Sequence, residues 1–73
     1  MIQMTGNERK NEILLFVNRF NDINGYSPSY REIADAVGLK SVSTVAHYVK
    51  QLEKDGLVVV EMDEQKTMLI KLL

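Results

Sequence analysis

The stretch "GYSPSYREIADAVGLKSVSTVAHYVKQLEKDGL", residues 25–57, contains the start and stop signals of two short helices joined by a tight turn. Ser29 and Glu32 have the spacing of a capping box, in which each side chain accepts from the other residue's backbone N–H. A helix is therefore predicted over 29–37. Gly38 comes directly after it, where a left-handed residue commonly ends a helix.

The second helix of the pair is predicted over 42–54, with Ser41 as a good N-cap. Helical spacing gives this segment two different faces. The apolar face consists of Val42, Val45, Val49 and Leu52. The opposite face carries Ser43, His47, Lys50, Gln51 and Lys54.

A longer helix is predicted before this pair, over about 7–24. Thr5 and Glu8 repeat the capping-box spacing, and apolar residues recur at intervals of three and four, namely Ile13, Phe16, Val17, Phe20 and Ile23. All four glycines lie where a helix would have to stop, which divides the chain into segments of helical length: Gly6, Gly25, Gly38 and Gly56.

After Gly56 the pattern changes to that of strands. "LVVVEM" and "TMLIKLL" are rich in β-forming residues and flank the polar stretch "DEQK", which predicts a β-hairpin over about 57–72. The side chains expected to be buried are Leu57, Val59, Leu69 and Ile70. The predicted fold class is α+β, mainly α: a winged helix-turn-helix, with three helices followed by a C-terminal antiparallel hairpin, in one domain over 1–73.

Composition limits the classes of function. A chain of 73 residues buries only about 60% of its unfolded surface, so its stability is modest. It has no cysteine and one histidine, so we expect no metal site, and we find no group of residues suited to catalysis or to a cofactor. No apolar run is long enough to span a bilayer, and no signal peptide is visible, so a cytoplasmic protein without a small-molecule substrate is expected.

A helix-turn-helix reads DNA with the amino end and polar face of its second helix. Ser43, Thr44 and His47 are short enough to let helix 42–54 approach base edges, and Lys40 and Ser41 stand where phosphates would meet its amino end. Longer cations suit phosphates, and these are Arg31, Lys50 and Lys54. The alternative remains open that this is a solvated face, and the tyrosines at 26, 30 and 48 are interpreted as covers of the core.

The net charge of −1 argues against nucleic-acid binding, because such domains usually carry a basic field. The charges are segregated, however. Residues 38–54 contain three lysines and one glutamate, giving +2, whereas residues 57–73 contain three acids and two lysines, giving −1. A locally basic face is therefore compatible with a nearly neutral domain.

The segment 25–58 resembles the amino-terminal DNA-binding domain of the LexA family of SOS repressors. The resemblance is carried by "GYSPSYREI", by "AVGLKS", by the "STV" start of the third helix and by "LEKDGL" before the wing. With the first helix and the hairpin it covers about 5–73. The "STV" version is similar to the domains of Gram-positive bacteria and their phages.

This resemblance implies a repressor of transcription that binds a palindromic operator as a dimer, with helix 42–54 in the major groove and the wing at the DNA backbone. The positions that would face DNA are Ser41, Ser43, Thr44, Ala46 and His47, and Arg31 would lie near the backbone. Of these, base contacts are expected from Ser43, Thr44, Ala46 and His47. Backbone contacts are expected from Arg31, Lys40, Ser41, Lys50 and Lys54.

Two departures from the family leave a rival hypothesis open. The chain lacks an Ala-Gly step and a peptidase domain, so self-cleavage is not expected of it, and dimerisation should be weak. The wing turn is acidic, since it holds Glu61, Asp63 and Glu64 against Lys66. Both features suit a winged module that binds another protein, such as an antirepressor. The small polar start of helix 42–54 favours DNA.

Overall fold

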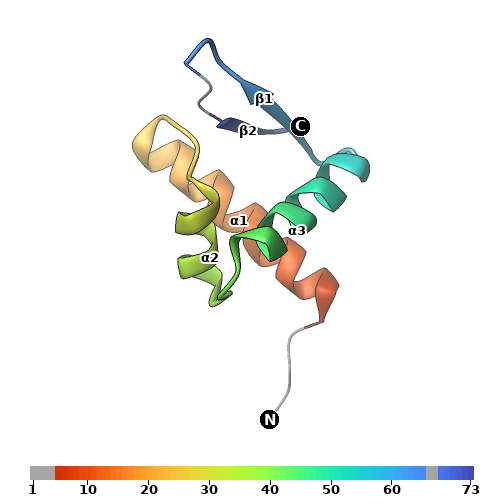
Figure 1. Cartoon of the computed structure of the whole chain (residues 1–73). Coiled ribbons are helices and arrows are strands. Elements are labelled where there is room, and N and C mark those ends of the chain that lie inside the picture. Colours follow the sequence, from red (N-terminus) through yellow and green to blue (C-terminus); the bar gives the residue numbers. More distant parts are fainter. Residues whose placement is uncertain (1–4, 66–67) are drawn as a thin grey trace.

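The computed structural model describes residues 5–65 and 68–73. Three helices precede two strands: α1 (Gly6–Asn24), α2 (Tyr30–Val37), α3 (Val42–Lys54), β1 (Val58–Met62) and β2 (Met68–Leu72). In Figure 1, α1 passes behind α2 and α3, and the hairpin lies over the carboxyl ends of α1 and α3. The predicted winged helix-turn-helix is confirmed, although α1 begins at Gly6 and α2 begins at Tyr30.

Side-chain caps and left-handed glycines set the helix bounds. The Thr5 hydroxyl accepts from the Glu8 backbone N–H at 3.2 Å, and Ser29 and Glu32 form the complete reciprocal box. Gly38 follows α2 with φ of 76°, in the region that L side chains rarely adopt, and its N–H donates to the Ala34 carbonyl. The turn between α2 and α3 is tight for this reason.

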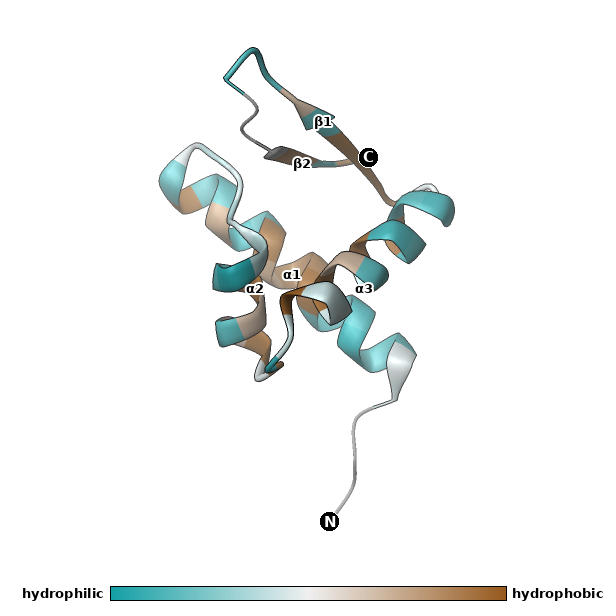
Figure 2. Ribbon diagram, in the orientation of Figure 1, coloured by the Kyte–Doolittle hydropathy of each residue, from teal (hydrophilic) through white to brown (hydrophobic). Residues whose placement is uncertain are grey.

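The core lies where the three helices and one face of the hairpin meet. Figure 2 shows the apolar surfaces of the helices turned toward one another, with the polar surfaces outward. The buried residues come from every element: Ile13, Val17, Ile33, Ala34, Val37, Val45, Val49, Leu52, Val58 and Ile70. Within the described residues, no helix has the length and apolar character to cross a membrane.

The hairpin is antiparallel, with Val58 paired to Leu72 and Val60 paired to Ile70. Val58 and Ile70 are 2% and 1% exposed, so the face of the hairpin that carries these two side chains packs against the helices. The expectation that Leu57, Val59 and Leu69 would be buried is wrong. Leu57 is 42% exposed, and the other two are half-buried on the outer face.

Two further expectations are corrected. Gly6 was expected where a helix stops, but it is the first residue of α1. Ile23 was placed on the buried face, yet it is 80% exposed, because the last turn of α1 extends beyond the core. The other three glycines do follow helices in left-handed conformation.

The first turns of α1 hold the ends of the other two helices. The Arg9 guanidinium donates to the Val37 carbonyl at the end of α2, and Lys10 forms an ion pair of 3.2 Å with Asp55, the C-cap of α3. The helix-turn-helix unit is thus braced from behind, which leaves the outward face of α3 exposed.

Candidate nucleic-acid interface

The outward face of α3 presents small and basic side chains in one row. Ser43, His47 and Lys50 are exposed, and Ala46 is half-buried between them. Their spacing of three and four places them on one side of the helix, while Val45 and Val49 on the other side are 0% and 1% exposed. The core therefore fixes which residues of α3 face outward.

This row forms one wall of a groove of about 620 Å³ that lies between α3, the start of α2 and the hairpin. Its lining includes four of the residues predicted from sequence to contact DNA, together with Val60 of β1: Ser43, Ala46, His47, Lys50. A second hollow of about 550 Å³ continues along the same helix, and it adds Gln51 and Lys54. The structure thus brings most of the predicted α3 residues to one continuous surface.

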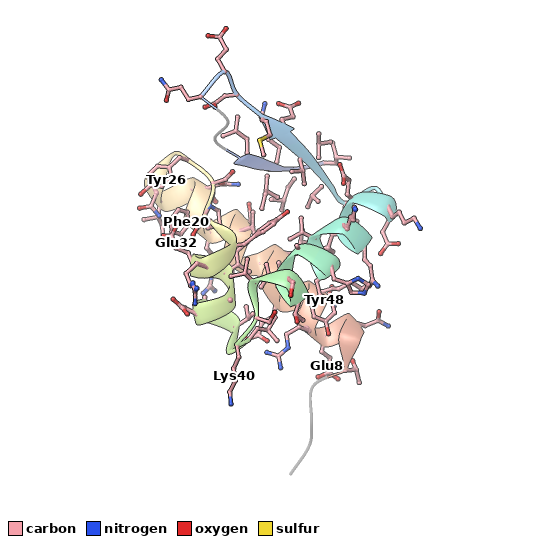
Figure 3. The ribbon with its side chains drawn as sticks, viewed as in Figure 1. Glu8, Phe20, Tyr26, Glu32, Lys40 and Tyr48 are labelled. Atoms are coloured by element: carbon pink, nitrogen blue, oxygen red, sulfur yellow. The ribbon has the colours of Figure 1, made fainter. Side chains whose placement is uncertain are left out.

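The remaining predicted residues lie outside both hollows. Ser41 and Thr44 are half-buried, and Arg31 and Lys40 are exposed. Figure 3 shows Lys40 at the turn between α2 and α3, projecting away from the hairpin. Lys40 and Lys50 therefore mark two separated points on the surface rather than one cluster.

The amino end of α3 differs from those of α1 and α2, because no side chain caps it. Ser41 occupies the N-cap position, but its hydroxyl contacts the Ser43 hydroxyl at 2.7 Å instead of a backbone N–H. The expected capping bond is therefore absent. The backbone N–H groups of the first turn remain available to an anionic group, which the helix dipole also favours.

His47 is held by its neighbour one turn further along α3. The Gln51 amide nitrogen lies 2.9 Å from the His47 Nε2 atom. The contact joins the two side chains along the exposed face of α3, and the role of each nitrogen in it depends on the tautomer of the imidazole.

Besides the apolar Val49 and Val60, two polar groove residues were not predicted from sequence as parts of the site. Tyr30, interpreted as a cover of the core, does pack against it but also lines the groove, and Glu53 lies beside it. Burial, and then the charge of Glu53, raise the pKa of the Tyr30 phenol, which therefore stays a hydrogen-bond donor. The sequence did offer a signal for Tyr30. It is the first residue of α2, a position where the core covers only one side of the ring.

The basic residues around the groove and the turn differ from Lys10 and Lys71, which form ion pairs. Lys10 pairs with Asp55, and Lys71 pairs with Glu61 at 3.1 Å. Over residues 5–65 and 68–73, no ion pair involves the basic residues around the groove and the turn: Arg31, Lys40, Lys50 and Lys54. Their charges are available for phosphates.

Comparison with known families agrees with this arrangement. The sequence profile of the family described as the LexA DNA binding domain matches residues 2–67. That range contains α1, α2, α3 and β1.

Curated relatives show the same similarity. The chain is 45% identical over 67 residues to the LexA repressor of Acetivibrio thermocellus, covering 92% of this chain and 30% of that protein. It is 45% identical over 58 residues to the LexA repressor of Clostridium perfringens, covering 80% and 29%. With the LexA repressor of Pseudarthrobacter chlorophenolicus, identity is 52% over 48 residues, covering 66% and 19%. The chain thus spans less than a third of the length of these relatives.

Proposed function

Because the chain belongs to the LexA DNA-binding domain family, we propose that it is the DNA-reading part of a transcriptional repressor, with α3 inserted in the major groove of its operator. The observation that carries this proposal is the outward face of α3. Small polar side chains and the cations Lys50 and Lys54 line one continuous surface there, and the amino terminus of the same helix is uncapped.

Residue roles follow from side-chain length and position. Ser43, Thr44 and His47 read base edges, because short hydroxyls and an imidazole reach them only when the helix backbone is close. Ala46 sits in the same row and offers apolar contact, for instance to a thymine methyl group.

Phosphates are held by a second set of residues. Lys50 and Lys54 extend from the far end of α3, and Lys40 and Ser41 lie at its start. Arg31 reaches the backbone from the first turn of α2. Contacts of this kind fix the register of the protein on DNA without reading sequence.

The operator is a palindrome of two half-sites, and two copies of the chain bind it as a weak homodimer. The dimer is weak because the sequence contains no long heptad seam through which two copies could pair. Val58 faces the core and is therefore unsuited to a dimer seam. The protein works in the cytoplasm, on the nucleoid, and binds rather than catalyses.

Selection of bound duplexes from a random pool, with the purified chain at low salt, tests this function. We expect enrichment of a palindromic motif, because two identical domains read two inverted half-sites. The matched control is a variant carrying Ser43→Ala, Thr44→Ala and His47→Ala, which keeps the fold and the lysines.

Loss of the motif with this variant supports α3 as the reader. Enrichment by the unaltered chain that does not exceed background overturns the proposal. A protein-binding role for the winged domain would then be the better interpretation.

A further inference from the structure

The second strand is tied to the helical part of the molecule through one residue. The Ile70 backbone N–H donates to the Ser27 hydroxyl at 2.9 Å, and the Ile70 carbonyl lies 3.1 Å from both the Ser27 hydroxyl and the Asn21 amide nitrogen. Both polar groups of this peptide unit therefore have side-chain partners. We call Asn21 and Ser27, with their bonds to Ile70, the clip.

The register shows which edge of the hairpin the clip occupies. The Leu73 backbone N–H donates to the Leu57 carbonyl, so these two residues form a hydrogen-bonded pair. Along an antiparallel hairpin, hydrogen-bonded pairs of opposite residues alternate with pairs that are not hydrogen-bonded to each other. Val60 and Ile70 fall on a pair that does not exchange bonds. The Ile70 groups hence point outward from β2, and the clip fills positions that a further strand would otherwise use.

The segment that carries Ser27 is itself firmly held. The Tyr26 ring meets Phe20 of α1 edge-on, with centroids 5.4 Å apart, and Pro28 is among the fully buried side chains. Figure 3 shows Phe20 and Tyr26 together at the end of α1. Ser27 directly precedes the buried Pro28, so it is a fixed point against which the hairpin can be oriented.

Apolar packing under the hairpin does not determine its tilt by itself. The contact of Val58 and Ile70 with the helices is non-directional, whereas hydrogen bonds weaken steeply when they are misaligned. The tilt matters because Val60 of β1 forms the wall of the 620 Å³ groove opposite Ser43 and Lys50. Rotation of the hairpin would widen or narrow this groove.

We propose that Asn21 and Ser27 are positioning residues for DNA binding, which fix the angle of the hairpin to α3 and thereby the width of the groove between Val60 and the α3 residues that face DNA. This inference rests on the proposed function. Neither side chain lines the groove, so the effect acts through the hairpin.

The expected loss of affinity follows from the fraction of molecules in which the hairpin has the productive orientation. If only a fraction of molecules holds the hairpin at the productive angle, the apparent dissociation constant rises by the inverse of that fraction. Loss of the clip, leaving the core intact, should weaken operator binding by about three- to tenfold.

The test compares the double variant Asn21→Ala, Ser27→Ala with matched controls. Asn24→Ala removes an amide on the same helix that bonds only locally, to the Phe20 carbonyl at 3.1 Å. Ser27→Thr keeps the hydroxyl and should preserve binding. Should the double variant unfold, each single substitution is measured instead.

The first measurement is made on the free protein. Residual dipolar couplings report the orientation of the hairpin relative to α3, and amide exchange reports protection of the Ile70 N–H. We expect a broadened orientation and faster Ile70 exchange in the clip variant alone. An unchanged orientation would overturn the inference, whatever happens with DNA.

The second measurement is affinity for the duplex recovered by selection. Weaker binding by the clip variant, with Asn24→Ala and Ser27→Thr unaffected, supports the positioning role. Equal affinity with an altered orientation would show that the groove width does not matter and would overturn it. If the unaltered chain selects no duplex, the proposed function fails, while the couplings still decide whether the clip orients the hairpin.

Discussion

The two walls of the groove differ in chemistry. The wall formed by α3 carries the Ser43 hydroxyl, an imidazole, the Glu53 carboxylate and Lys50, which forms no ion pair within the described residues. The hairpin contributes the apolar Val60, its Lys71 is neutralised by Glu61, and its turn bears Asp63 and Glu64. The α3 wall is therefore suited to contact with DNA, whereas the hairpin is suited to packing against the helical core.

This difference shows why the net charge of the chain is a poor guide to its partner. Phosphates respond to the local field, which decays over about 10 Å at moderate salt. An acidic wing tip therefore subtracts little from the field of the separate lysines at the start and end of α3, provided that the tip lies away from the DNA. Because the hairpin packs on the core and α3 carries the polar wall, we expect removal of the hairpin to lower stability. Substitutions on the outward face of α3 should instead weaken DNA binding.

The largest effect is expected from deleting the hairpin, by ending the chain after Gly56. Val58 and Ile70 are fully buried, and each contributes roughly 1.5 to 3 kcal/mol, a large share of what so small a domain can supply. The truncated chain should be largely unfolded by circular dichroism. A helical chain with a cooperative melt would show that the helices form a core without the ribbon.

A neighbouring pair on β2 sharpens the same point. Ile70→Ala should lower the free energy of unfolding by about 2 to 5 kcal/mol, because it leaves a cavity under the hairpin. Leu69→Ala, on the half-buried outer face, should cost much less. Urea unfolding of both variants gives the comparison, and equal losses would mean that the two faces are not distinguished as described.

On the α3 wall, Ser43→Ala or His47→Ala should cost about 1 to 3 kcal/mol of binding to the selected duplex and little on random DNA. Stability should hardly change, since both side chains are exposed. Fluorescence anisotropy with the two duplexes measures this. Binding that survives replacement of Ser43, Thr44 and His47 together would contradict the base-reading assignment.

A smaller and less selective effect is expected from Lys50→Ala. It should weaken specific and random DNA alike and reduce the slope of log affinity against log salt by about one unit. Glu64→Gln in the wing turn is the control, and it should leave affinity nearly unchanged. A marked gain of affinity with Glu64→Gln would place the acidic turn close to phosphates. It would contradict the assignment of DNA contact to the α3 wall and not to the hairpin.

The smallest effect concerns Tyr30 at high pH. Burial and the charge of Glu53 hold its pKa above the ordinary value of 10.0, so the folded state keeps the phenolic proton that the unfolded state loses first. Its contribution to stability is complete below pH 10 and is lost as the pH rises through the folded value. Tyr30→Phe should reduce the fall in melting temperature above pH 10, as thermal melts of the two proteins over that pH range would show.

Helix bounds were predictable because they depend on local chemistry. The box formed by Ser29 and Glu32, and the left-handed Gly38, act within a few residues of their own positions. The phase of the hairpin also had a local signal, which the expectation for Leu57, Val59 and Leu69 overlooked. Glu61 and Lys71 alternate with Val60 and Ile70, and their ion pair lies on the outer face that also carries Val59 and Leu69.

The candidate site was predictable in its α3 part, because Val45 and Val49 fix the inward face and thus leave Ser43 and His47 outside. The remaining features depend on elements that are distant in sequence. The approach of Tyr30 to Glu53 and the bonds of Asn21 to Ile70 arise only once the helices and hairpin have docked. No local pattern encodes them.

The closing of the hairpin onto α1 has a consequence for how the protein is made. Asn21 meets Ile70 across 49 residues, and Lys10 meets Asp55 across 45, so the molecule is joined by contacts between its beginning and its end. Such long closures follow the local formation of helices. On the ribosome, the helix-turn-helix unit can take helical form early, but its core stays open to water until Ile70 has emerged from the exit tunnel. A nascent chain that still lacks β2 should therefore be a target for chaperones rather than a competitor for operator DNA.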